Sequence, residues 1–332
     1  MRSGEFELIR KLTSSFSIKN KDVVVGVGDD CAVIKSSSSR YILATVDAQV
    51  AGVHFLPETP PERIGQKAVA VSISDIAAMG GTPKHCLVSL FLPKNIADNY
   101  VERVYRGITR ECRAYSIDVV GGNITSAHQF AIDVALLGEV NPKNVLLRRG
   151  ARVGDKVLVT GSLGNAGAGL YLLQNPRTQV PAAVRKLLVA KQNNPTPRVW
   201  ESSIIAHARK ATAMIDISDG LAQDMLHIAE QALVGVTLYE NQLLVSREVK
   251  SFCKATGKNP SEFALAGGED YELLFTAPPS HANALIRKVK KETGTAVTVI
   301  GEITKKEMGN WLILNNGRKK QLKPDGWNHL RV

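Results

Sequence analysis

Ala213-Met-Ile-Asp-Ile-Ser-Asp-Gly-Leu-Ala-Gln-Asp224 brings three carboxylates to the junction between a strand pattern and a helical pattern. Apolar residues alternate with Asp216 as in a short strand, and apolar residues recur at helical spacing after Gly220. Ser218 or Asp219 is the natural N-cap of that helix, because its side-chain oxygen can accept an N–H of the first turn. Carboxylates packed this densely repel one another, so they need counter-charge from a divalent cation or from protein cations.

Four other acidic turns share this pattern, most of them with glycine beside the carboxylates. Any one of them is a weak signal, because Gly and Asp are common in turns. Together they predict a shared site for several metal ions and phosphate, since Gly lets backbone N–H groups approach phosphates and oxygen ligands suit Mg²⁺. The turns are Gly26-Val-Gly-Asp-Asp-Cys31, Thr45-Val-Asp47, Ser74-Asp-Ile-Ala-Ala-Met-Gly80 and Gly267-Gly-Glu-Asp-Tyr-Glu272.

The composition is that of a globular protein. With 332 residues the chain is long enough for two domains, and 44% hydrophobic with 22% charged residues gives no reason to expect disorder. No apolar run approaches the roughly 18 residues of a membrane span, and Met1-Arg-Ser-Gly-Glu-Phe6 lacks the apolar core of a signal peptide. We therefore expect a cytoplasmic protein without a membrane partner.

The cysteines and the basic residues argue against other classes of protein. Four widely spaced cysteines with no C-x-x-C pair give little support to a zinc site or a disulfide framework. The formal charge is +11, but runs such as Arg287-Lys-Val-Lys-Lys291 are not interleaved with aromatic residues. We therefore expect no nucleic-acid partner, although the positive field would attract anionic phosphates.

Strand and helix patterns alternate along the chain and predict two α/β domains. Asn141-Pro-Lys-Asn144 is the best candidate linker, so we place the domains at 1–143 and 144–332. The expected helices are 4–16, from Pro60-Pro61 to about Met79, 96–115, 183–191, 197–210, 246–255 and 279–292. The expected strands are 23–27, 31–34, 41–47, 86–92, 117–121, 129–138, 234–239, 272–276, 296–301 and 311–314.

Lys156-Val-Leu-Val-Thr-Gly-Ser-Leu-Gly-Asn-Ala-Gly-Ala-Gly169 has the pattern of a strand, a glycine-rich turn and a helix. It lacks the G-x-G-x-x-G spacing of dinucleotide-binding turns and the G-K-[ST] of a P-loop. Close packing of the strand on the helix and a backbone role near a nucleotide remain equally open.

Taken together, the motifs resemble those of the thiamine-monophosphate kinases. The resemblance covers nearly the whole chain, from Gly4 to the Gly326-Trp-Asn-His329 tail, and the order and separations of the motifs are specific. Aminoimidazole ribonucleotide synthetase and selenophosphate synthetase share the architecture but not the full set. The motifs are Gly4-Glu-Phe, Gly28-Asp-Asp, Thr45-Val-Asp47 with Val53-His-Phe55, Ser74-Asp-Ile-Ala-Ala-Met-Gly, Ile215-Asp-Ile-Ser-Asp-Gly and Gly267-Gly-Glu-Asp-Tyr-Glu.

The resemblance implies a fold, an assembly and a reaction. The fold would be the two-domain α/β fold of aminoimidazole ribonucleotide synthetase, with a carboxy-terminal α/β sandwich. The amino-terminal domain would bind ATP and Mg²⁺, and its strands would pair with those of a second subunit in a barrel that spans a homodimer. The enzyme would use ATP to convert thiamine monophosphate to thiamine diphosphate, as in thiamine diphosphate biosynthesis, with several Mg²⁺ ions assisting direct in-line transfer.

The resemblance also implies roles for individual residues. Asp216, Asp219 and Arg148 would be catalytic. The thiamine phosphate would meet His54, Glu269 and Trp327. ATP would contact Gly121, Gly122, Arg148 and Ser218, with Tyr105 as a weaker candidate. Mg²⁺ would be held by Asp30, Thr45, Asp47, Asp75, Asn123, Asp216 and Asp219.

Elementary chemistry agrees with these roles. The acceptor phosphate already carries its attacking oxygen as an anion, so no strong general base is required and a Walker lysine is not needed. Arg148 could stabilise charge on the transferred phosphoryl group, although its neighbour Arg149 could be mistaken for it. The indole of Trp327 suits stacking on a cationic thiazolium or a pyrimidine ring.

Two positions depart from the family pattern. Gly121-Gly-Asn-Ile-Thr125 replaces the usual Gly-Gly-Asp-Thr, so Asn123 offers a carbonyl oxygen but no negative charge to a metal. Val46 stands where a hydroxyl residue is common. We predict that activity survives with a raised Mg²⁺ requirement.

Three rival functions remain. The first is another enzyme of this architecture that activates an amide or formyl oxygen with ATP, against which Trp327 and the Glu269 motif argue. The second is a catalytically silent metal-binding or nucleotide-binding regulator, which the changes at Asn123 and Val46 allow. The third, a basic nucleic-acid-binding protein, has the least support and would show strongly salt-dependent binding.

Overall fold

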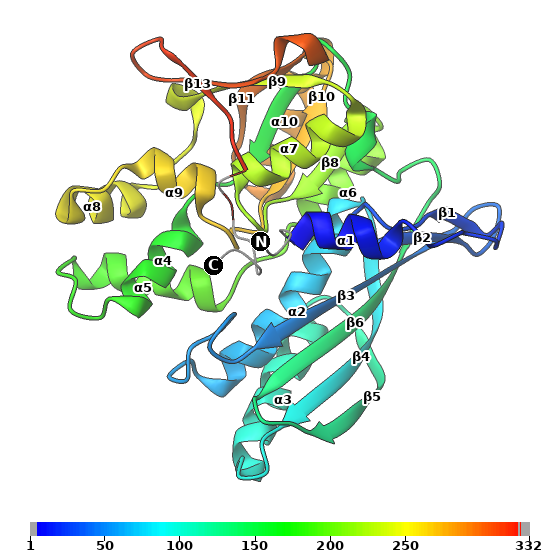
Figure 1. The fold of residues 1–332 in the computed structure, drawn as a ribbon, viewed down its shortest axis with the longest axis vertical. Coiled ribbons are helices and arrows are strands. Elements are labelled where there is room, and N and C mark those ends of the chain that lie inside the picture. The colour runs from blue at the N-terminus through cyan, green and yellow to red at the C-terminus, as the bar shows by residue number, and fades with distance from the viewer. Residues whose placement is uncertain (1–4, 325, 327–332) are drawn as a thin grey trace.

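The computed structural model describes residues 5–324 and Gly326. The prediction for Trp327 therefore lies outside the described residues. Two mixed sheets with flanking helices form a two-domain α/β fold, as expected (Figure 1). In the described part of the chain, no helix is long and apolar enough to cross a lipid bilayer.

The amino-terminal sheet has six strands in the order β1-β2-β3-β6-β4-β5, and α2 and α3 pack on one of its faces. Its hairpin β2–β3 turns at Ser36 to Ser39, where the backbone N–H groups of Ser36 and Ser37 donate to Arg40 O. The elements are α1 (Glu5–Thr13), β1 (Val23–Val25), β2 (Ala32–Lys35), β3 (Tyr41–Val50), α2 (Pro61–Ala78), β4 (Thr82–Leu92), α3 (Asp98–Ala114), β5 (Asp118–Ser126) and β6 (Ala131–Val140).

The carboxy-terminal sheet has seven strands in the order β13-β12-β9-β11-β7-β10-β8. Its strand elements are β7 (Lys156–Thr160), β8 (Ala213–Asp216), β9 (Gly235–Tyr239), β10 (Leu273–Ala277), β11 (Val297–Thr304), β12 (Asn310–Ile313) and β13 (Lys319–Gln321). Its helical elements are η1 (Arg148–Gly150), α4 (Asn165–Gln174), α5 (Ala182–Asn193), α6 (Val199–Ala208), α7 (Leu221–Ala232), η2 (Glu240–Gln242), α8 (Arg247–Thr256), α9 (Pro260–Ala266), α10 (Pro279–Thr293) and η3 (Lys306–Met308).

Helices cover both faces of this second sheet, because its central strands are apolar on both sides. Val157 and Val159 point into a core shared with α4, α7 and α8, whereas Leu158 between them points into a core shared with α6 and α10. The predicted domain boundary at residues 143 and 144 lies between β6 and β7, and it stays a prediction.

Helix α2 joins the two domains. Nearly all of its residues are buried, because the helix carries small and apolar side chains on all of its faces. Pro61 can begin the helix because the first N–H of a helix has no partner within it. It packs on α3, β3 and β6 of the first domain and on β8, α5 and α6 of the second (Figure 1). Two polar side chains of α2, Lys67 and Ser74, contact residues of the second domain.

The capping prediction at the start of α7 was wrong. The N-cap is Gly220, at φ 124° and ψ 146°, a backbone conformation that suits glycine. The Asp224 carboxylate, one turn into the helix, accepts the Gly220 N–H at 3.1 Å instead. Ser218 and Asp219 are thus free to serve a site. The patterns also missed α9, whose N-cap is Asn259.

The face of the amino-terminal sheet opposite α2 and α3 carries exposed apolar side chains. Val46, Leu87 and Leu137 on three neighbouring strands are 64%, 42% and 36% exposed. Beside them β5 forms the edge of the sheet, and every residue of this strand is exposed. An exposed edge of this kind is a template for pairing with another strand.

Candidate active site between the domains

The centre of the site is a cluster of carboxylates contributed by both domains. Oxygens of Asp30, Asp75 and Asp216 lie within 4.8 Å of one another. Asp30 follows a turn in which Gly28 takes φ 124°, Asp75 lies on α2, and Asp216 ends β8. The fold thus brings together residues that are far apart in the sequence.

Hydroxyl groups and a fourth carboxylate complete the cluster. Thr45 Oγ1 donates to Asp75 Oδ2, and Ser74 Oγ donates to Asp216 Oδ2, both at 2.5 Å. Asp47 is hydrogen-bonded to Asp75 and to Ser72 on α2. One oxygen each of Asp30 and Asp47 is buried without a hydrogen-bond partner. A buried carboxylate oxygen without a donor requires a cation or a proton.

The pKa values show how strongly these carboxyl groups resist ionisation in the absence of a cation. Burial first, and then the charges of Asp47 and Asp216, hold the pKa of Asp75 well above its usual range. Burial and Asp30 raise the pKa of Asp216 to about 8. Burial also raises the pKa values of Asp30 and Asp47. A divalent cation bound here would displace these protons and neutralise the repulsion between the carboxylates.

Arg148 is the cation closest to the cluster among the described ion pairs. Its guanidinium pairs with Asp30, and its backbone N–H donates to Asp29 Oδ2 at 3.2 Å. Burial opposes the charge, but the Asp30 and Asp29 carboxylates raise the pKa of Arg148 above its usual value. The short helix η1 that carries Arg148 packs against α7. Among the described residues, Asp29 and Asp30 form ion pairs with Arg148 and not with Arg149, the alternative at this position.

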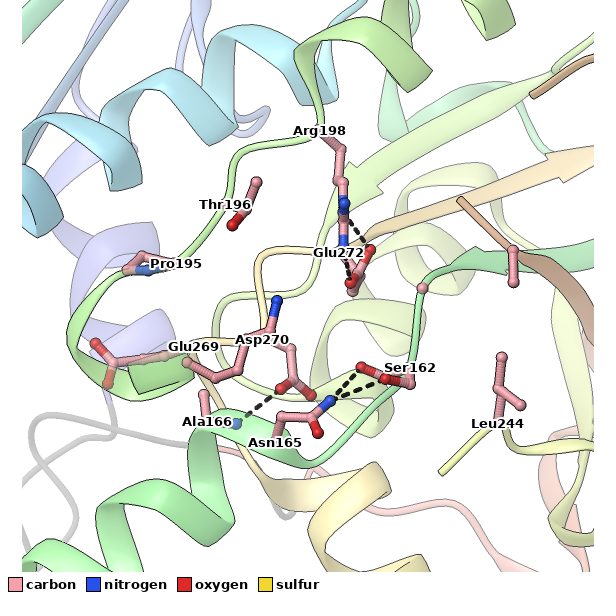
Figure 2. A pocket seen from close by; sticks show the side chains of 13 residues that line it. Ser162, Asn165, Ala166, Pro195, Thr196, Arg198, Leu244, Glu269, Asp270 and Glu272 are labelled. Atoms are coloured by element: carbon pink, nitrogen blue, oxygen red, sulfur yellow. Dashed lines mark hydrogen bonds and ion pairs between the residues drawn. The ribbon is translucent and has the colours of Figure 1, made fainter. Parts of the chain in front are cut away.

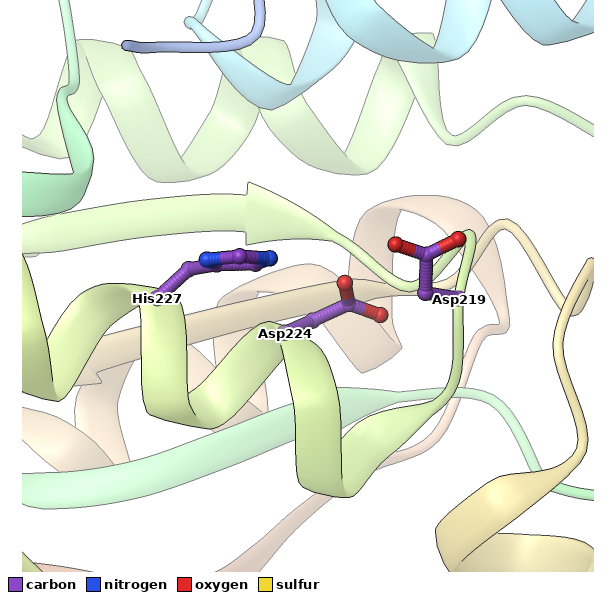
Figure 3. A group of neighbouring side chains, drawn as sticks. All are labelled: Asp219, Asp224 and His227. Atoms are coloured by element: carbon purple, nitrogen blue, oxygen red, sulfur yellow. The ribbon is translucent and has the colours of Figure 1, made fainter. Parts of the chain in front are cut away.

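A second acidic group lies at the start of α7. Ligand atoms of Asp219, Asp224 and His227 lie within 4.8 Å of one another (Figure 3). Burial, and then Glu5 of α1, raises the pKa of Asp219 to about 6, and burial with Arg148 lowers the pKa of His227 to about 4. Asp219, one of the expected metal ligands, therefore belongs to this second group and not to the first.

Glu269 and His54 are connected through Lys67 of α2. The Glu269 N–H donates to Ser218 O at 2.7 Å, and Glu269 takes φ 64°, which is uncommon for a residue with a side chain. Lys67 of α2 pairs with Glu269 at 2.6 Å and donates to His54 O at 3.0 Å. The motif around Glu269 is thus tied to the Asp216 stretch and to the first domain.

Glu269 also borders a pocket of about 250 Å³ in the second domain (Figure 2). The Glu272 carboxylate lies across the pocket from Glu269 and is paired with Arg198. The Asp270 carboxylate points to the start of α4 and accepts the N–H groups of Gly164 and Ala166. The glycine-rich turn before α4 therefore serves at least the packing role.

The structure does not bring the residues of β5 to the cluster within one chain. Asp47 pairs across the sheet with Val134, which pairs with Val88, which pairs with Gly122, so three strand spacings of about 4.8 Å separate Asp47 from Gly122. Asn123 lies in one row across the sheet with Ser89, Asp133 and Ala48. Ala48 follows Asp47 on β3, so this row lies on the face of the sheet opposite Asp47. Gly121 lies on the same strand, and Tyr105 on α3 packs against the first domain's core.

Sequence reasoning missed the side chains that support the cluster. Lys67 and Ser72 on α2 contact the functional groups but belong to no acidic turn, and Ser74 stands in such a turn but was given no role. Their signal was present, since polar residues inside an otherwise small and apolar helix are buried only when partnered.

Comparisons with known proteins agree on the family. The AIR synthase related protein N-terminal domain matches residues 28–140, and the corresponding C-terminal domain matches residues 152–310. The thiamine-monophosphate kinase of Aquifex aeolicus (strain VF5) is 38% identical over 327 residues, which are 98% of each chain. The thiamine-monophosphate kinase of Bacillus subtilis (strain 168) is 33% identical over 98% of this chain and 99% of the relative.

A solved structure described as AaThiL complexed with AMPPCP and TMP has the same fold. It superimposes with a TM-score of 0.86 at 38% identity, over 99% of both chains. The chain therefore belongs to the AIR synthase related family and, within it, to the thiamine-monophosphate kinases.

Proposed function

We propose that this enzyme transfers the γ-phosphoryl group of ATP to thiamine monophosphate, giving ADP and thiamine diphosphate. An oxygen of the acceptor phosphate forms a bond to the γ-phosphorus, while the bond from that phosphorus to the β-phosphate oxygen breaks. The observation that carries the proposal is the buried carboxylate cluster between the domains, with two partnerless oxygens. We infer the identity of the acceptor from the relatives, which are thiamine-monophosphate kinases.

Mg²⁺ fits the cluster, because all of the candidate donors are hard oxygens and two of them lack a partner. Asp30, Asp47, Asp75 and Asp216, with the Thr45 hydroxyl, would hold Mg²⁺, and Asp219 would hold a further ion. When bound, Mg²⁺ neutralises the phosphates and stabilises charge during in-line transfer. Asp224 and His227 stand beside Asp219 and shape its surroundings.

The remaining residues bind and orient the reactants. Arg148 lies beside Asp30, where its guanidinium can stabilise charge on the transferred phosphoryl group. His54 Nδ1 accepts the Val50 N–H at 3.0 Å, so the proton of the neutral ring is on Nε2. Glu269 and Ser218 are joined through their backbones, which supports adjacent sites for acceptor and ATP. No side chain has to remove a proton from the acceptor phosphate.

A homodimer would complete the nucleotide site. Gly121, Gly122 and Asn123 lie on an exposed edge strand, away from the cluster of their own chain. The exposed apolar face that carries Val46 and Leu87 gives a second copy a surface to cover. The partner's β5 would then supply the nucleotide-binding residues that this chain's own β5 holds away from its cluster. This arrangement would form the barrel expected from the family.

The test is formation of thiamine diphosphate from ATP across a Mg²⁺ titration, with unphosphorylated thiamine as the control acceptor. We expect product with thiamine monophosphate only, and none without Mg²⁺. Folded protein that binds ATP but makes no product at any Mg²⁺ concentration would instead support a nucleotide-binding regulator. Turnover of an amide or formyl substrate would support the other enzymes of this architecture.

A further inference from the structure

Lys67 is a buried cation at the junction of the two domains. Its side chain is only 4% exposed, and its ammonium group lies 2.6 Å from Glu269 Oε1 and 3.0 Å from His54 O. Glu269 belongs to the second domain, whereas His54 and Lys67 belong to the first. One side chain thus connects the two residues that we expect to meet the acceptor.

The position of Lys67 on α2 links the acceptor side to the carboxylate cluster. Lys67 precedes Asp75 by eight residues on one helix, a rise of about 12 Å at 1.5 Å per residue. The helix is buried along nearly its whole length and has no interior proline. It therefore acts as a rigid spacer between Glu269 at one end and the cluster at the other.

The partners of Glu269 show why the cation is needed. The carboxylate accepts one further bond, from Gln192 Nε2 of α5, and its side chain is 22% exposed. The backbone at Glu269 is in the left-handed region at φ 64°, a conformation that is unfavourable for a residue with a side chain unless its surroundings hold it. Without Lys67, a largely buried carboxylate on a strained turn would lose its only cationic partner among the described ion pairs.

We propose that Lys67 is a positioning residue for the acceptor: it fixes Glu269 and the His54 loop at one separation, and it acts through them rather than on the reacting phosphates. This inference rests on the proposed function. Since Lys67 contacts neither the carboxylate cluster nor Arg148, its loss weakens acceptor binding and leaves phosphoryl transfer intact once the acceptor is bound.

The experiment compares steady-state kinetics of the wild type, Lys67→Met and Lys67→Arg in the assay for thiamine diphosphate. For Lys67→Met we expect the KM for thiamine monophosphate to rise about tenfold or more, with kcat and the KM for ATP nearly unchanged. Lys67→Arg keeps a buried cation and should recover much of the loss. The matched control is Lys156→Met, which removes a half-exposed ion pair with Glu302 far from the site and should leave all constants unchanged.

Three results would overturn the inference. An unchanged KM for the acceptor in Lys67→Met would show that the contacts of Lys67 with Glu269 and His54 do not position the acceptor. A collapse of kcat at saturating acceptor would place Lys67 at the reacting atoms. If Lys67→Met does not fold, the variant Gln192→Leu removes the other hydrogen bond to Glu269. An unchanged acceptor KM in Gln192→Leu would then count against a positioning role for Glu269 and its partners. A wild type without turnover would overturn the proposed function itself, which is a separate result.

Discussion

Asp75 is the residue on which the site depends most. It lies at the centre of the cluster, accepts from Thr45, and is repelled by Asp47 and Asp216. For Asp75→Asn we expect activity to fall about a thousandfold, and we expect Mg²⁺ no longer to raise the Tm. Asp155→Asn is the control, because Asp155 is a buried carboxylate that bonds Arg152 N and Thr212 instead. It should lower the Tm without changing the Mg²⁺ effect.

We predict that Asn123 raises the Mg²⁺ requirement, provided that a partner's β5 brings this residue to the carboxylate cluster. An amide oxygen adds no charge to a metal site, so Asn123→Asp should lower the Mg²⁺ concentration for half-maximal activity severalfold. The control is Asn316→Asp, which adds the same charge at an exposed turn of the second domain. An unchanged Mg²⁺ dependence in Asn123→Asp would show that no metal is bound at this position.

At the scale of an element, we propose that β5 mediates the homodimer. A lysine on an edge strand opposes pairing with another strand, so Ile124→Lys, at a side chain that is 65% exposed, should give a monomer. Since the Gly121 and Gly122 residues would then be far from the cluster, activity should fall as well. Light scattering after gel filtration measures the mass. Leu233→Lys, at an apolar residue that is 66% exposed in the second domain, is the control and should not change it.

The elements show what the sequence could predict. Long periodic segments such as α2 and α10 were predicted to within a residue or two, because buried faces repeat clearly. The start of α7 was not, because Gly220 with the Asp224 carboxylate replaces an ordinary cap. The acidic turns gave Asp30, Asp75 and Asp216 as a group, but Lys67 and Ser74 became visible only when α2 was placed between the domains.

At the scale of the whole molecule, we expect protons and Mg²⁺ to compete for one cluster. The cluster carboxyl groups have folded pKa values above their unfolded ones, so their contribution to the stability of the metal-free protein is greatest at low pH and is lost as pH rises through about 8. Mg²⁺ binds the deprotonated groups. We therefore expect the Tm increase caused by Mg²⁺ to grow between about pH 6 and about pH 8.5. A pH-independent increase, measured by differential scanning fluorimetry, would place the ion elsewhere.

The most direct test of the proposed metal site is to locate the bound ion. A crystal of the protein grown with Mn²⁺, a non-hydrolysable ATP analogue and thiamine monophosphate would give anomalous peaks at bound Mn²⁺. We expect peaks between the domains, about 2.1 Å from carboxylate oxygens of Asp30, Asp47, Asp75 and Asp216. Nucleotide bound with no anomalous peak at these four residues would contradict a phosphoryl-transfer site built on the carboxylate cluster.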